Sequence, residues 1–288
     1  MLILVPLGMY WRHPADLVHP RDGHRKILLM IDAYLDESGI HEGAAVCVIS
    51  GYFGGRGQWR KLEILWRQIL KKAGYALEDF HANKWVKNEA KYGSVLDDLA
   101  RATTQYKIYP VSVGVVVADF FSFSEEDRRF LTGATLMPSG KLKGTGSPNQ
   151  AYFLPFTHVI KTVSSYAPVG GKAHFFFGVD KQLYGYANEL FKKLWNDPLA
   201  PFRERIGTVA APLAKETPPL QAADLLAHLT YVDLQDRLAN NTWDQQLPQR
   251  LVTCLGGARM REDFVYYNKM CIELSLRNPQ LDPDVGKR

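Results

Sequence analysis

Cysteine is scarce in this chain, and long apolar runs are absent. Its 288 residues include three cysteines, Cys47, Cys254 and Cys271, and no CxxC pair. Such an odd, scattered set argues against a disulfide framework and against a cysteine-rich zinc site. The apolar segment at residues 1–5 is cut by Pro6 and is far shorter than the ~18 residues that a membrane span needs. We therefore expect a protein of the reducing cytoplasm, with no signal peptide and no membrane anchor.

Several familiar catalytic motifs are also missing. Residues 51–57 read GYFGGRG, but they lack the GK[ST] ending of a phosphate-binding loop, which argues against nucleotide binding by that mechanism. No serine nucleophile elbow is present, and Cys47 lies inside an apolar segment typical of a packed thiol. Lys and Arg exceed Asp and Glu by 35 − 30 = 5 residues, so the charge permits a polyanionic partner without requiring one.

The rest of the composition is that of a globular protein, because 46% of the residues are apolar and 23% are charged. Apolar runs alternate with segments of helical periodicity, which predicts an α/β fold. Strands are expected at residues 27–36, 44–51, 108–117, 173–180 and 206–211. Helices are expected at residues 58–73, 94–106, 150–165, 185–195, 218–238 and 262–276. Since a short connection joins the first two strands, we expect a mixed β-sheet flanked by helices.

The chain reads as one main domain with two flanking segments. We expect residues 1–26 to form an irregular N-terminal extension, residues 27–240 the α/β domain and residues 241–288 a helical C-terminal tail. A stretch rich in Gly, Ser, Pro and Lys near residues 124–150 predicts a loop insertion. We interpret it as a surface insertion, with a mobile lid as the alternative.

Three carboxylates stand inside or at the end of apolar segments, where an ionised group is costly unless it is paired or bound. Asp36 ends the first predicted strand, and Asp180 ends the apolar run at 173–179. Asp224 lies two turns inside a helix that is apolar nearly all round. Asp32 shares a strand face with Asp36 but lies ~13 Å from it, so the two cannot ligate one metal ion. The alternatives are solvent-facing turn acids at Asp36 and Asp180, and a structural hydrogen bond at Asp224.

These acids belong to a first strand, a later strand and a final helix, and we expect them to converge at one edge of the sheet. Hard carboxylate oxygens without a Cys/His cluster favour Mg²⁺ or Mn²⁺ over zinc. Two such ions ~4 Å apart activate a water and stabilise the leaving oxygen of a phosphodiester. The predicted metal ligands are Asp36, Asp180 and Asp224.

Two motifs also resemble those of a known family. Residues 34–39 (YLDESG) and 219–227 (PLQAADLLA) resemble the signatures of the bacterial and phage family called domain of unknown function 3800. The resemblance extends to Asp180 at the end of a middle strand and to His81 ahead of a helix, and it covers about residues 27–240. It implies a ribonuclease-H-like fold and a metal-dependent nuclease site built from the same three acids.

Ribonuclease-H-like enzymes usually add another acidic residue, and no single position here fills that role. The candidates are Glu37, Asp79 and His81. Glu37 has the opposite strand parity to Asp36, so it reaches the same site only if the strand has already turned. His81 is a candidate proton shuttle or phosphate ligand, and the alternative is an ordinary hydrogen-bonded polar residue.

Contacts to a nucleic acid are predicted at Lys84, Lys87 and Lys91, which lie beside Trp85 and Tyr92. Cations interleaved with stacking rings are typical of single-strand binders, and a solvated helix face is the alternative. The predicted function is hydrolysis of phosphodiester bonds in RNA or DNA by a metal-dependent nuclease. The alternatives are a non-catalytic nucleic-acid- or protein-binding module on the same fold and a phosphoesterase acting on a small nucleotide.

Oligomeric state is left open by the sequence. Trp59, Trp66 and the tail helix are equally suited to internal packing and to contact with a second copy of the chain, so a homo-oligomer is one of the alternatives.

Overall fold

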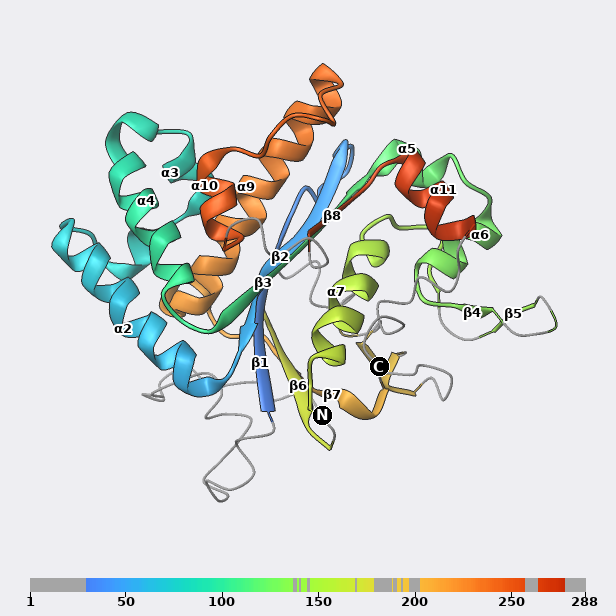
Figure 1. The fold of residues 1–288 in the computed structure, drawn as a ribbon, viewed down its shortest axis with the longest axis horizontal. Helices are drawn as coiled ribbons and strands as arrows, with labels where there is room; N and C mark the ends of the chain where they lie inside the picture. Colours follow the sequence, from blue (N-terminus) through green and yellow to red (C-terminus); the bar gives the residue numbers. More distant parts are fainter. Residues whose placement is uncertain are drawn as a thin grey trace.

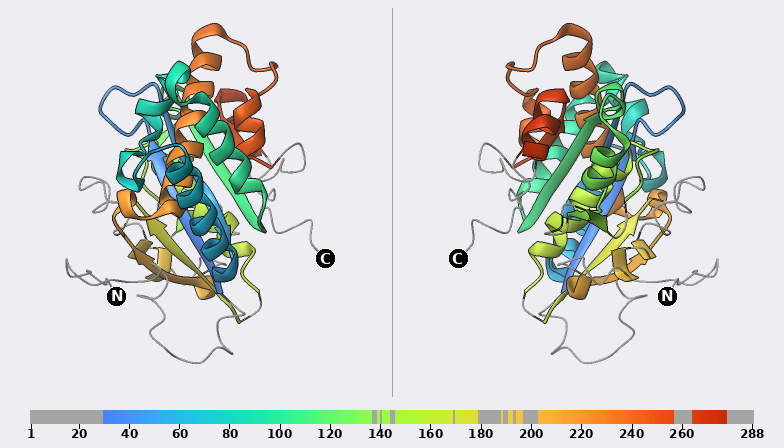
Figure 2. Two further views of the ribbon diagram at one scale, coloured as in Figure 1. Left: turned by 90° about the vertical axis from the view of Figure 1, so that its left-hand side faces the viewer. Right: turned by 90° about the vertical axis from the view of Figure 1, so that its right-hand side faces the viewer.

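A mixed six-stranded sheet with helices on both faces forms the centre of the computed structural model (Figures 1 and 2). The predicted α/β class is therefore confirmed. The structure describes residues 30–136, 139, 141–143, 146–168, 170–178, 188, 191–192, 194–196, 203–256 and 264–277. The expected N-terminal extension, most of the helix expected at 185–195 and the candidate ligand Asp180 lie outside these residues.

The sheet has the strand order β7-β6-β1-β2-β3-β8. Its strands are β1 (Met30–Ser38), β2 (Val46–Gly54), β3 (Ile108–Val116), β6 (Lys172–Phe177), β7 (Ile206–Ala210) and β8 (Phe264–Tyr267). β1, β2 and β3 form an antiparallel meander. β6 runs parallel to β1, β7 parallel to β6, and β8 parallel to β3. The expected mixed sheet is confirmed, and β8 is a strand that the sequence did not predict.

β1 lies in the middle of the sheet because its residues are apolar on both faces. Ala33, Tyr34 and Leu35 are fully buried, and so are the phenylalanines of the neighbouring strand β6. Leu35 pairs in register with Phe177, so β1 and β6 end side by side. Any polar residue just beyond these ends comes to the same edge of the sheet.

One face of the sheet packs against the longest helices. These helices are α2 (Arg56–Lys72), α4 (Glu89–Thr104) and α9 (Pro218–Asn240), joined by α3 (Ala82–Val86), α10 (Gln249–Cys254) and the short η2 (Leu77–Asp79) and η4 (Ala214–Glu216). The opposite face is covered by α7 (Phe153–Ser165), with α5 (Val117–Phe121) and α11 (Lys269–Arg277) beyond it (Figure 1). Among the described residues, these two layers and the sheet between them account for the large apolar clusters.

α9 begins and ends at positions that the sequence marks. Thr217 occupies its N-cap and prolines its first turn, where a missing N–H costs nothing. At the other end Asn241 adopts a left-handed conformation with φ 53°, a common way to end a helix. The helix is buried nearly all round, as expected for a helix between a sheet and other helices.

Two regions differ from the expected pattern. The segment at 124–150, predicted to be an irregular loop, contains helix α6 (Glu125–Leu131) and a two-stranded ribbon of β4 (Thr135–Leu136) and β5 (Leu142–Lys143). Ser124 caps α6 by accepting a hydrogen bond from the Asp127 N–H. The predicted helical tail holds β8 as well as α10 and α11, and β8 extends the central sheet beside β3.

Two observations bear on the expectations drawn from composition. All three cysteines are free thiols, and Cys47 is buried in the sheet as a packed residue whose pKa is raised by burial. Within the described ranges, no helix is both long enough and apolar enough to cross a membrane.

Candidate functional site

A cavity of about 690 Å³ opens at the end of β1, beside α9. Its walls come from the turn after β1, from the segment that leads into and out of α3, and from one side of α9. Five residues singled out in the sequence line it: Asp36, Glu37, His81, Lys87 and Asp224. The fold thus brings together side chains that are widely separated along the chain.

Asp36 reaches the cavity from the sheet face that packs against α9. It shares strand parity with Tyr34, whose ring belongs to the cluster under α2 and α9. Its neighbour in register on β2 is Ser50, whose hydroxyl shares a 2.5 Å hydrogen bond with that of Ser112. Ser112 in turn shares a 2.9 Å hydrogen bond with Thr230 of α9. This chain of hydroxyls fixes α9 over β3 and β2, next to the strand that carries Asp36.

Gly178, directly after β6, lies against the carboxylate of Asp36. A Cβ atom at Gly178 would be 2.8 Å from Asp36 Oδ1, which is closer than a carbon atom tolerates. The edge where β1 and β6 end is therefore shaped by a residue without a side chain. Asp180 follows two positions later, outside the described residues, so its predicted place beside Asp36 stays a prediction.

Asp224 lies between α9 and the start of α3. Its Oδ2 accepts a 3.0 Å hydrogen bond from the backbone N–H of Ala82. The structural hydrogen bond considered as an alternative is thus present, and the carboxylate lines the cavity as well. Burial raises the pKa of Asp224, while the Ala82 N–H and the nearby His81 ring act in the opposite direction. An ionised Asp224 would therefore be stabilised by a further positive charge in the cavity.

Glu37 lines the cavity although its strand parity is opposite to that of Asp36. Its charge acts on two groups of the other sheet face, Cys47 and Tyr152, whose pKa values are raised first by burial and then by Glu37. The strand turns directly afterwards, where Gly39 has a φ of 76°. Glu37 thus stands at the rim between the two faces, in a position that fits an auxiliary role.

His81 and Asp79, the other two candidates, have different surroundings. His81 is the N-cap residue of α3, is exposed and lines the cavity. The carboxylate of Asp79 accepts a 2.8 Å hydrogen bond from the Ala76 N–H and so closes the turn of η2. Asp79 is exposed and is not part of the cavity wall, so the structure does not bring it to the other acids.

The three predicted nucleic-acid-binding lysines are separated by the fold. Lys87 lines the cavity, whereas Lys84 and Lys91 are exposed elsewhere on the same segment. Trp85 and Tyr92 stack on each other with ring centroids 4.5 Å apart and planes 8° apart, and both are buried. The expectation that these two rings alternate with lysines on a base-stacking surface is therefore wrong, because the rings pack in the core.

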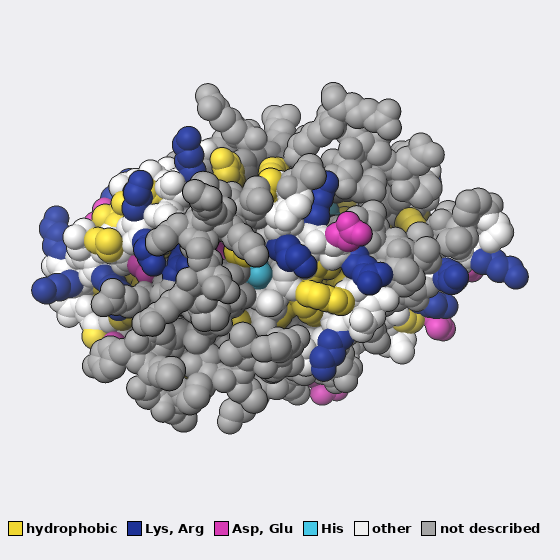
Figure 3. All heavy atoms as spheres, turned by 90° about the horizontal axis from the view of Figure 1, so that it is seen from below, with side chains coloured by type: hydrophobic (Ala, Val, Ile, Leu, Met, Phe, Trp, Pro, Cys, Tyr) yellow, Lys and Arg dark blue, Asp and Glu magenta, His cyan; other side chains and the backbone are white. Residues whose placement is uncertain are grey.

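Basic side chains are scattered over one face of the molecule. Seen from below the view of Figure 1, the Lys and Arg side chains that are described lie at both ends and in the middle, with a few acidic ones among them (Figure 3). The described side chains of this face therefore do not by themselves locate a polyanion site.

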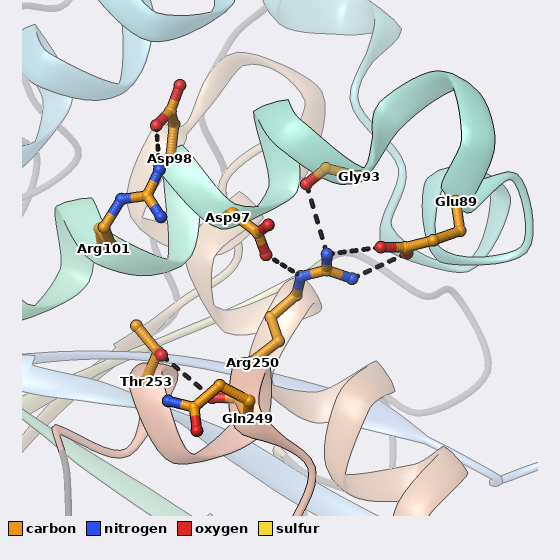
Figure 4. Close-up of polar contacts among 8 residues, drawn as sticks. All are labelled: Glu89, Gly93, Asp97, Asp98, Arg101, Gln249, Arg250 and Thr253. Atoms are coloured by element: carbon orange, nitrogen blue, oxygen red, sulfur yellow. Dashed lines mark hydrogen bonds and ion pairs between the residues drawn. The ribbon is translucent and has the colours of Figure 1, made fainter.

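Arg250 joins α10 to α4, the helix that follows α3. Its guanidinium donates to both carboxylate oxygens of Glu89 at 2.8 and 2.6 Å and to Asp97 at 2.7 Å (Figure 4). A longer bond of 3.3 Å reaches the backbone oxygen of Gly93. These contacts tie α10 to the first turns of α4, which begins two residues after Lys87. The charge-assisted hydrogen bonds of the guanidinium thus hold α10 and the start of α4 together.

The cavity also contains polar residues that the sequence reading passed over. On α9 these are His228, Tyr231 and Gln235, and they share the helix face of Asp224. His228 is 7% exposed, and among the described residues its Nε2 has no hydrogen-bond partner. Burial lowers the pKa of His228 to about 4, and the positive charges of Lys87 and His81 add to this. The ring is therefore neutral near pH 7. The i, i+4 spacing of His228 from Asp224 is the sequence signal that could have identified it as a site residue.

The donors in the cavity suit a hard cation. Asp36 and Asp224 offer carboxylate oxygens, and Mg²⁺ is commonly held by one or two carboxylates together with waters and substrate phosphate. Among the residues that the structure describes, no group of three His, Cys, Asp or Glu side chains is arranged to hold a metal ion. The described part of the cavity thus contains two carboxylates of the type predicted, and the third predicted ligand, Asp180, lies outside the described residues.

Comparison with known proteins adds no relative: no family model, no curated protein and no solved structure matches this chain.

Proposed function

We propose that this chain is a metal-dependent nuclease of ribonuclease-H-like fold that hydrolyses phosphodiester bonds in RNA or DNA. The observation that carries the proposal is the meeting of Asp36 and Asp224, 224 − 36 = 188 residues apart, in one cavity that also contains His81 and Lys87. Two acids and two basic residues in one concave site are the groups that metal-assisted phosphodiester hydrolysis requires.

The order of the strands supports the ribonuclease-H-like part of the proposal. Along β3-β2-β1-β6-β7, an antiparallel meander is followed by two strands parallel to β1, which is the arrangement of ribonuclease-H-like sheets. The two motifs that resemble domain of unknown function 3800 lie at the end of β1 and in α9, on either side of the cavity. Membership of that family is part of the same proposal.

The candidate residues have distinct roles in this mechanism. Asp36 and Asp224 would hold Mg²⁺ or Mn²⁺, with Asp180 as the third ligand. The ion would supply an activated water and neutralise charge on the phosphate. Lys87 pairs with the phosphate that is attacked. His81, exposed at the rim, exchanges a proton with solvent or with the leaving oxygen, and Glu37 is auxiliary.

A cleavage assay tests the proposal. End-labelled single-stranded RNA, single-stranded DNA and an RNA–DNA hybrid are incubated with the protein in Mn²⁺. We expect cutting by the wild type of at least one substrate and its loss in Asp36→Asn and in Asp224→Asn. Asp79→Asn is the matched control, because Asp79 is an acid that caps a turn outside the cavity.

Two outcomes would count against the proposal. Cleavage that survives both cavity substitutions would place the chemistry elsewhere. Absence of cleavage by folded wild-type protein on all three substrates would favour the non-catalytic binding module.

A further inference from the structure

One side of α9 presents a row of polar groups to the cavity. The row consists of Asp224, His228, Tyr231 and Gln235, spaced by four, three and four residues, whereas most of the remaining helix surface is buried in apolar packing. At ~1.5 Å per residue the row is about 16 Å long. The row therefore extends well beyond Asp224, and it is longer than the contact with one phosphate group requires.

His228 is the first group in the row after the acid, and no described residue lies within hydrogen-bond reach of its Nε2. Its side chain is 7% exposed, and buried polar nitrogens are normally hydrogen-bonded. Because the residue lines the cavity, a ligand in the cavity is the partner available to this nitrogen.

Tyr231 is held in place by its neighbours. Its ring lies so close to Gly39 that a Cβ atom there would be 2.5 Å from Tyr231 Cε2. Its hydroxyl accepts a 2.7 Å hydrogen bond from the side-chain amide of Gln235. The ring plane is 27° from that of His228, with centroids 6.4 Å apart. Tyr231 and His228 thus form a fixed, nearly parallel pair of rings along the cavity wall.

We propose that a single strand of nucleic acid runs along α9, with its phosphodiester beside Asp224 and the adjoining base stacked on the ring of Tyr231. The inference rests on the proposed function and names its substrate class. An aromatic surface receives any base through its π-face, and this requires a base that is not stacked in a duplex. The unpartnered Nε2 of His228 meets the edge of that base, and Lys87 meets the phosphate.

Base-dependent binding is the property that tests this inference. Fluorescence polarisation is measured with a short labelled oligothymidylate and with an oligonucleotide of the same length that has a sugar-phosphate backbone but no bases. EDTA is present, so that affinity is measured without cleavage. We expect the intact strand to bind wild-type protein about tenfold more tightly than the abasic strand.

Variants of the ring locate the contact. Tyr231→Phe keeps the ring and is expected to keep the preference for bases, and Tyr231→Leu is expected to lose it. Tyr109→Leu is the matched control, because Tyr109 is an exposed tyrosine of β3 that does not line the cavity. If Tyr231→Leu does not fold, the comparison of the two strands on wild-type protein still decides the question.

Three results would overturn the inference: equal affinity for both strands, no binding of either strand, or full competition by thymidine monophosphate at the concentration of the strand. Failure of the nuclease proposal is distinguishable from these results. A base preference without any cleavage in Mn²⁺ would refute the nuclease and leave the binding row intact, whereas cleavage with equal affinities would refute the binding row alone.

Discussion

At the scale of single residues, the position of Asp36 depends on the absence of a side chain at Gly178. A Cβ atom at that position would be 2.8 Å from Asp36 Oδ1. The φ of Gly178 is not in the left-handed region, so alanine suits the backbone, and the group that must move is the carboxylate at the end of the Asp36 side chain. A side chain at position 178 is therefore expected to displace the Asp36 carboxylate and to leave the fold largely unchanged.

Gly178→Ala is accordingly expected to fold normally and to cleave more slowly. A displaced ligand misplaces the reacting groups, and we expect a loss in rate on the order of tenfold to a hundredfold. The melting temperature is expected to stay near that of the wild type. Gly57→Ala is the control, because a Cβ atom there meets no neighbour within 4 Å. A cleavage rate equal to that of the wild type would show that cleavage does not depend on the position of the Asp36 carboxylate.

Asp32 is the buried acid of β1 that the cavity does not use. It is 2% exposed, its Oδ1 has no hydrogen-bond partner in the part of the chain that the structure describes, and burial raises its pKa from 3.8 to about 7. Between these two values the unfolded chain is ionised while the folded chain still binds the proton. Ionisation of Asp32 therefore lowers the free energy of unfolding as the pH rises through this window.

We expect Asp32→Asn to remove that loss. Relative to the wild type, the variant is expected to gain stability from about pH 4 to about pH 8, because asparagine has no charge to desolvate. Urea unfolding of both proteins across this range measures the difference. Glu63 of α2, whose pKa burial also raises to about 7, titrates in both proteins and cancels in the comparison. A difference that stays constant with pH, or that falls, would contradict the assignment.

The sequence was enough to predict which acids belong to the cavity. It predicted the packing around the cavity only in part. Strand parity and helix periodicity identified Asp36 and Asp224 as acids in apolar elements, and the structure brings both to one cavity. Trp85 and Tyr92 were misread because a sequence does not tell a ring exposed between lysines from one that packs beneath them. His228 was passed over because its unmet nitrogen is a property of its packing.

At the scale of elements, α9 joins the site to the rest of the fold. Near its middle, Thr230 bonds to the sheet through Ser112. One turn further, Asp233 accepts hydrogen bonds of 2.7 Å from Arg237 and from Tyr266 of β8, and both members of the ion pair are nearly fully buried. Arg237 also donates to backbone oxygens beyond the end of the helix. These bonds fix α9, and with it the cavity row, against β3 and β8 of the sheet.

Arg237→Met is expected to be strongly destabilising, because it leaves the buried carboxylate of Asp233 without its cation. Removal of one partner of a buried ion pair costs about 3–5 kcal/mol. Equilibrium unfolding in urea measures the loss. The double variant Asp233→Asn with Arg237→Met removes the unpaired charge, and it is expected to recover part of the stability. A double variant no more stable than the single one would mean that packing, and not the charge, accounts for the effect.

The elements with strong periodicity were predicted, and the short ones were not. β1, β2, β3, β6, β7, α2, α4, α7 and α9 occur close to their expected ranges. β8 has four residues and is a strand because it pairs with β3, a long-range contact that leaves little trace in local sequence. α6 had a signal, Ser124 followed by three acids, but the Gly- and Pro-rich residues around it masked the helix.

At the scale of the whole molecule, topology makes the site. β1 lies between β2 of the meander and the parallel strand β6, and the parallel course of β1 and β6 brings their ends to one edge. α9 crosses one face of this sheet (Figure 1), and its polar row lines the cavity at that edge. The sequence contained the acids and their order, and their convergence requires the strand order. The central claim is that this convergence creates a divalent metal site.

A titration with Mn²⁺, in which the heat of binding is measured by calorimetry, tests that claim most directly. We expect wild-type protein to bind the ion and both Asp36→Asn and Asp224→Asn to lose most of the affinity. Asp32→Asn is the matched control, since Asp32 is an acid of the same strand that does not line the cavity, and its binding is expected to equal that of the wild type. Equal Mn²⁺ affinity in all four proteins, or no binding by the wild type, would contradict the account.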